Sequence, residues 1–147
     1  MTFGIKTLFK RDPDRYEGVR RINIYLLRIL YALMFFMLGQ TTWTEILTHQ
    51  GPWDPNKAVT WCVWTGFSAV AGIGILHPLK MPPILLLELF YKSLWLLLVA
   101  YPLWSAGSLA GSSAEGIANV FFPVFVVVLI IPWGYVFKQY SPFRRER

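Results

Sequence analysis

The sequence predicts an all-α integral membrane protein, a four-helix bundle that crosses a bilayer four times with both termini in the cytoplasm. Three observations lead to this prediction: an apolar composition, four long apolar segments, and a bias of Lys and Arg toward one side. Of the 147 residues, 55% are hydrophobic and 15% are charged, whereas about a quarter of the residues are charged in soluble domains. We therefore expect a single membrane domain over residues 1–147, without a separate soluble domain.

The four expected spans cover about residues 22–47, 58–76, 84–103 and 117–137. A helix needs about 20 apolar residues to cross a hydrocarbon core of about 30 Å. The first segment is longer than a signal-peptide core and lacks a small-residue cleavage site, so we expect it to remain in the mature protein. Pro123 and Pro132 should bend the fourth span, because proline interrupts helical hydrogen bonding.

The distribution of basic residues predicts the orientation of the spans. On the opposite side from the termini, Lys57 stands alone. Loops rich in Lys and Arg stay in the cytoplasm, so we expect a multi-pass protein of the bacterial inner membrane with a basic segment at 1–21 and a basic tail at 138–147. The net charge of +6 is then explained by topology, and we expect contacts with membrane lipids and none with nucleic acid. Eleven residues lie on the side of the termini: Lys6, Lys10, Arg11, Arg15, Arg20, Arg21, Lys80, Lys138, Arg144, Arg145 and Arg147.

Three ionisable residues lie within the expected spans: Arg28 in the first, and Glu88 and Lys92 in the third. Each costs roughly 2.5 to 3.5 kcal/mol near the centre of a bilayer on insertion scales. Glu88 and Lys92 are four residues apart on one helical face, and Arg28 has a similar depth. We expect them to form one buried polar group with Tyr31 and Tyr91 as hydroxyl donors. This group is either a ligand or proton-relay site or a structural ion-pair network.

A second cluster of polar residues is expected at the outer surface. Glu45 and His49 are four residues apart, and Asp54 follows in the loop. His and carboxylates are ordinary ligands of divalent cations, but a single His and a Gly-Pro break favour a solvated helix end. We therefore predict no metal site. If a metal ion were bound, these three residues would be its candidate ligands. The sequence assigns no cofactor. Cys62 is the only cysteine, which excludes an intramolecular disulfide.

Small residues form a stripe along the second span, which ends at His77. Such stripes let two membrane helices approach closely. We expect packing against a helix of the same chain, and an interface in a homo-oligomer or larger membrane complex is the alternative. His77 is interpreted as a helix-end residue near the C-terminal dipole rather than as a catalytic base. The stripe consists of Thr65, Ser68, Ala69 and Gly72.

The first span contains Leu26-Leu27-Arg28, followed by Phe35 and Gly39. This spacing resembles the LLR-x6-F-x3-G pattern of DoxX-like proteins, a family of small four-helix bacterial membrane proteins. The resemblance covers the first span and the four-span layout only. It implies an inner-membrane bundle, in some members an accessory subunit of quinone-linked redox systems. This chain supplies no set of cofactor ligands for a redox role of its own.

Three functions remain open from the sequence. We expect first a non-enzymatic accessory or interaction subunit, because the loops are too short for a soluble active site. The second is a small homo-oligomeric transporter in which Glu88 is the coupling carboxylate. The third is a membrane protein that binds a lipid or quinone, with Arg28 or Lys92 holding an anionic headgroup. Such a protein could also be an enzyme that acts on the bound lipid or quinone.

Overall fold

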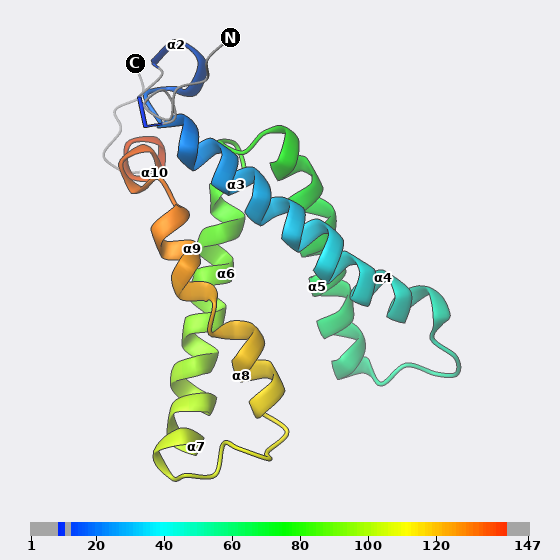
Figure 1. Cartoon of the computed structure of the whole chain (residues 1–147). Coiled ribbons are helices and arrows are strands. Elements are labelled where there is room, and N and C mark those ends of the chain that lie inside the picture. Colours follow the sequence, from blue (N-terminus) through cyan, green and yellow to red (C-terminus); the bar gives the residue numbers. More distant parts are fainter. Residues whose placement is uncertain (1–8, 11–12, 141–147) are drawn as a thin grey trace. The chain divides into compact units, whose positions relative to one another are not determined.

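The computed structural model describes residues 9–10 and 13–140, and the regular elements among them are helices (Figure 1). Three helices are long and apolar enough to cross a membrane: Arg21–Thr48, Pro55–Leu76 and Pro82–Ser105. A fourth candidate is the broken helix formed by Glu115–Ile130 and Trp133–Tyr140. The expected all-α class and the presence of several candidate spans are confirmed, and the orientation of the termini stays a prediction. Much of the basic segment 1–21 and of the tail 138–147 lies outside the described residues.

The chain divides into two compact units. One unit contains Met1–Pro82 and Pro132–Arg147, and the other contains Pro83–Ile131. In the first unit, the short helix α2 (Pro13–Tyr16) is followed by a turn in which Glu17 and Gly18 have φ angles of 51° and 81°. This left-handed turn leads into the first long helix.

The first long helix combines three segments, which Figure 1 shows as one continuous ribbon in blue to cyan. They are α3 (Arg21–Leu33), the π-helical segment η1 (Met34–Leu38) and α4 (Gly39–Thr48). Together they correspond to the expected span 22–47. A π-helical turn changes the hydrogen-bonding register of a helix, and here the carbonyl of Phe35 accepts a hydrogen bond from Ser68 Oγ at 3.4 Å.

Helix α5 (Pro55–Leu76) begins three residues before the expected span 58–76. Asp54 caps the helix, since its carboxylate accepts a hydrogen bond from the backbone N–H of Lys57 at 2.9 Å. Pro55 occupies the first helical position, where its fixed φ is favourable and its missing N–H is not needed. The helix ends before His77, whose backbone N–H donates to Ile73 O at 2.9 Å.

The small residues of α5 allow close packing against the first long helix. A Cβ built at Gly74 would lie 2.7 Å from the ring of Tyr31, and one at Gly72 would lie 3.0 Å from the ring of Phe35. Ser68 is fully buried. Within this unit the two helices therefore approach each other through residues that lack bulky side chains.

The second unit consists of the third span and most of the fourth. The third span combines α6 (Pro82–Trp95), the π-helical segment η2 (Leu96–Ala100) and α7 (Tyr101–Ser105). It is followed by α8 (Glu115–Phe121) and α9 (Val124–Ile130), drawn in yellow and orange in Figure 1. Buried apolar residues in this unit include Leu85, Ala118, Phe121, Val124 and Val127.

Both prolines of the fourth span mark interruptions, where one bent helix over 117–137 was expected. Pro123 lies directly between α8 and α9. Ile131 has φ −59° and ψ 125° and so leaves the helical conformation, as a residue that precedes a proline tends to do. Pro132 then precedes α10 (Trp133–Tyr140), which belongs to the first unit.

Candidate functional site

Glu88 and Lys92 form a direct ion pair on α6, as their spacing predicts. Glu88 is buried, with 5% of its surface exposed. The side chain of Lys92 is 15% exposed. The two charges compensate each other within one helical turn, which lowers the free-energy penalty of placing each of them in an apolar span.

An aromatic ring lies over the ammonium group of Lys92. Lys92 Nζ lies 5.4 Å from the ring centroid of Phe121 on α8, a distance at which a cation is attracted to the face of a ring. The ring of Phe121 also contacts Tyr91 and Trp95 in edge-on geometry, with centroid distances of 5.7 and 5.2 Å. The ion pair thus joins α6 to α8 within the second unit.

The carboxylate of Glu88 is only partly satisfied. Its Oε2 atom is buried and has no hydrogen-bond partner among the described residues. A buried acceptor without a partner costs about 1 to 3 kcal/mol. This oxygen is therefore the atom of the group that is chemically available to a proton or to an additional donor.

Arg28 lies in the other unit and is half-buried. Its Nε atom has no hydrogen-bond partner in the part of the chain that the structure describes. The Tyr31 hydroxyl, also in that unit, donates to the carbonyl of Pro78 at 3.4 Å. The pairing of Arg28 with Glu88 would join the two units and stays a prediction.

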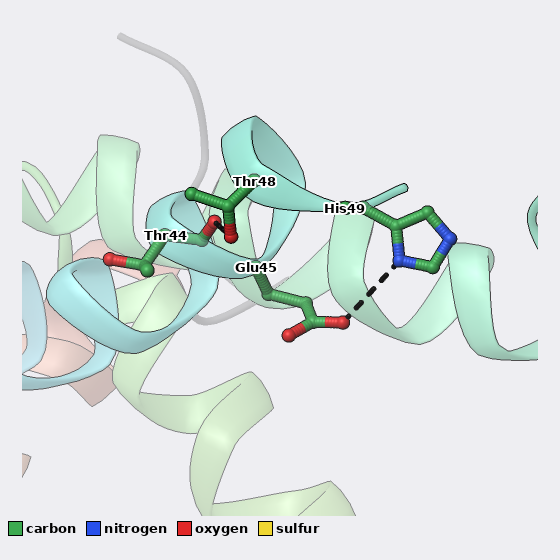
Figure 2. Close-up of polar contacts among 4 residues, drawn as sticks. All are labelled: Thr44, Glu45, Thr48 and His49. Carbon is green, nitrogen blue, oxygen red and sulfur yellow. Dashed lines mark hydrogen bonds and ion pairs between the residues drawn. The ribbon is translucent and has the colours of Figure 1, made fainter. Parts of the chain in front are cut away.

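Two of the three candidate metal ligands, Glu45 and His49, lie close together (Figure 2). Glu45 Oε1 on α4 lies 3.6 Å from Nδ1 of His49, the residue that directly follows this helix. The ring of His49 stacks on Trp53 at a centroid distance of 3.5 Å. Asp54 does not join them, since its carboxylate caps α5. Among residues 9–10 and 13–140, no group of three or more His, Cys, Asp or Glu side chains is placed to hold a metal ion.

The small residues of the stripe on α5 are not all buried. Thr65 and Ser68 are buried, and Gly72 packs against Phe35 of the same unit. Ala69 is exposed and does not take part in this packing. The face that meets the first long helix instead continues through Ala71 and Gly74, which are buried.

Sequence reasoning did not find a cavity of about 460 Å³ in the first unit. Its wall combines the turn after α2, the start of α3 and one side of α10. The only feature of the sequence that pointed to this cavity was the presence of basic residues before the first expected span and after the fourth. Its polar and aromatic lining includes Glu17, Arg20, Asn23, Trp133, Tyr135 and Lys138.

A second hollow, an apolar groove of about 610 Å³, lies within the second unit. The groove runs between the end of the third span and the α8–α9 segment. Its lining is almost entirely apolar, which is the chemistry of an acyl chain or of another apolar surface. Aromatic and aliphatic side chains in its wall include Leu97, Tyr101, Trp104, Phe122 and Phe125.

Comparisons of the chain with protein-family models, with curated proteins and with solved structures give no match. The fold itself defines the class: a small helical protein with three to four helices that could cross a membrane. The resemblance of the first span to DoxX-like proteins stays a prediction from the sequence.

Proposed function

We propose that the chain is a multi-pass inner-membrane protein, with both termini in the cytoplasm, that works as a non-catalytic accessory or interaction subunit. The observation that supports this proposal is the compensation of charge at Glu88 and Lys92. Lys92 contacts both the carboxylate of its own helix and the Phe121 ring of α8. An ion pair whose charges compensate each other in this way stabilises helix packing, and the apolar outer surface of the spans is then the surface through which the protein acts.

The placement in the membrane is supported by the charge distribution. Eleven Lys and Arg residues on the side of the termini face a single Lys57 on the other side. The four-span layout and the first-span pattern of Leu26, Leu27 and Arg28 are consistent with a DoxX-like inner-membrane bundle. Alkaline phosphatase and green fluorescent protein fused to each terminus test the orientation, because only a cytoplasmic terminus gives fluorescence without phosphatase activity.

A subunit of this kind should have a partner in fixed stoichiometry. We expect purification in a mild detergent to give a complex whose mass exceeds that of this chain and its homo-oligomers. Deletion of this chain should lower the amount of that partner in the membrane. A chain that is recovered only as a homo-oligomer, and whose loss changes no other membrane protein, contradicts the proposal.

One observation favours the transporter as a second candidate function. Glu88 Oε2 is buried without a hydrogen-bond partner among the described residues, as expected of a carboxylate that takes up and releases a proton. In liposomes containing the purified chain, a transporter should carry a proton current that Glu88→Gln abolishes. Glu45→Gln is the matched control, because Glu45 also contacts a residue four positions later in the sequence, His49.

The two candidates differ in what happens to stability. If the ion pair is structural, Glu88→Gln and Lys92→Met each lower the free energy of unfolding, by about 3 to 5 kcal/mol for a buried pair. The double variant should then lose less than the sum of the two, because no unpaired charge remains. Additive losses together with a Glu88-dependent current would instead establish the transporter.

A further inference from the structure

The cavity at the start of the first span carries two basic side chains that form no ion pair with the described residues. Arg20 and Lys138 line it from two segments that are far apart in the sequence, and both are exposed. Neither forms an ion pair with any residue that the structure describes. Glu17 is the one acidic residue in the lining, so the cavity keeps an excess of positive charge.

The remaining lining suits an anion with several oxygen atoms. The Asn23 side chain adds an amide that can donate hydrogen bonds, and the ring of Trp133 adds an amphipathic surface. The cavity lies at the start of α3, a helix of 13 residues whose N-terminus has no side-chain cap. The backbone amides and the dipole at such an end favour negative charge.

The position of the cavity along the chain indicates its depth. Arg20 is the residue that precedes the first candidate span, and Lys138 lies in the last turn of α10, the second part of the broken fourth candidate. Trp is enriched at the headgroup level of a bilayer, and Trp133 lies in the same wall. A membrane protein with this arrangement exposes the cavity to lipid headgroups rather than to acyl chains.

We propose that this cavity binds a phosphate group, and specifically the phosphodiester of an anionic phospholipid such as phosphatidylglycerol. The guanidinium of Arg20 and the ammonium of Lys138 neutralise the phosphate, and Asn23 donates to its oxygens. This inference rests on the proposed placement in a membrane, but it does not depend on the role of the Glu88–Lys92 pair.

The test uses the full chain in nanodiscs and in detergent. Native mass spectrometry during a titration with phosphatidylglycerol or phosphatidylcholine measures an apparent dissociation constant for each lipid. Each basic side chain near an anionic lipid contributes about fivefold in affinity. We therefore expect Arg20→Gln with Lys138→Gln to weaken phosphatidylglycerol binding roughly 25-fold and to leave phosphatidylcholine binding unchanged.

Lys80→Gln is the matched control, because Lys80 is an exposed basic residue on the same expected side and does not line the cavity. A photoactivatable phosphatidylglycerol should crosslink to residues 17–23 or 132–138 in the wild type and not in the double variant. The proposal is overturned if the double variant keeps its affinity, or if Lys80→Gln loses as much. The melting temperature in phosphatidylcholine shows whether each variant is folded.

Inorganic phosphate and glycerol phosphate distinguish the source of the phosphate group. If either one alone stabilises the detergent-solubilised chain, and Arg20→Gln with Lys138→Gln removes that effect, the cavity binds free phosphate compounds as well as lipids. If neither compound stabilises the chain and phosphatidylglycerol stabilises it, the lipid is the ligand. Because both leaflets of a nanodisc have the same composition, an error in the proposed orientation of the termini does not alter the outcome.

Discussion

The contact between Gly74 on α5 and Tyr31 on α3 allows a quantitative test of the packing in the first unit. A Cβ at Gly74 would lie 2.7 Å from two ring atoms of Tyr31 and 2.9 Å from a third. Carbon atoms in good contact are about 3.5 to 4.0 Å apart, so a methyl group requires a movement of roughly 1 Å. The ring cannot easily move away, because Tyr31 is fully buried and its hydroxyl donates to Pro78.

Two substitutions on the same helix separate this clash from the helix propensity of alanine. Gly74→Ala combines a propensity gain of up to about 1 kcal/mol with an overpacking loss of about 1 to 3 kcal/mol. Gly66→Ala should give only the gain, since a Cβ there meets nothing within 4 Å. We expect Gly74→Ala to be less stable than Gly66→Ala by about 1 to 3 kcal/mol, measured by unfolding in one detergent.

A third substitution tests whether Tyr31 is the cause. In a Tyr31→Leu background the ring is absent, and the difference between Gly74→Ala and Gly66→Ala should become much smaller. Equal stability of the two alanine variants in the wild-type background would refute the reasoning. So would a penalty for Gly74→Ala that is unchanged in the Tyr31→Leu background, because the clash would then involve other atoms.

Three further substitutions test local contacts in the same unit. Gly39→Ala places a Cβ 2.6 Å from Ser68 Oγ, so we expect a loss of about 1 kcal/mol as that hydroxyl rotates away; thermal unfolding should show no such loss in a Ser68→Ala background. Asp54→Ala should lower stability by about 1 kcal/mol and speed hydrogen exchange at the start of α5, whereas Asp54→Asn should not. Tyr135→Phe removes the 3.0 Å hydrogen bond to Leu79 O and should lower the free energy of unfolding by about 1 kcal/mol.

The positions of the spans were predictable because hydrophobicity depends on local composition. The earlier start of α5 was also visible in the sequence, since Asp54 followed by Pro55 is a typical helix start. The π-helical segments Met34–Leu38 and Leu96–Ala100 were not predictable. Runs of apolar residues have the same hydropathy in either hydrogen-bonding register, so their composition gave no sign of the change.

Candidate site residues were predictable to the extent that they lie on one helix. The four-residue spacing of Glu88 and Lys92 predicted their contact, because that spacing places two side chains on one face. The position of Phe121 over Lys92 depends on tertiary packing between α6 and α8, which no local pattern encodes. For the same reason, the cavity lined by Arg20 and Lys138 could not be found from either segment alone.

Lys92, on the one hand, and Arg20 and Lys138, on the other, lie in two different environments, and the difference follows from where each charge is stable. Lys92, within an apolar helix, is paired with Glu88 and covered by the ring of Phe121, because an unpaired cation is costly in lipid. Arg20 and Lys138, at the ends of the set of spans, have no such partner among the described residues, and a cation there is stabilised by anionic headgroups. Neutralising Glu88 should therefore change stability in every lipid. Neutralising Arg20 and Lys138 should change only the preference between lipids, so the two groups separate folding from lipid recognition.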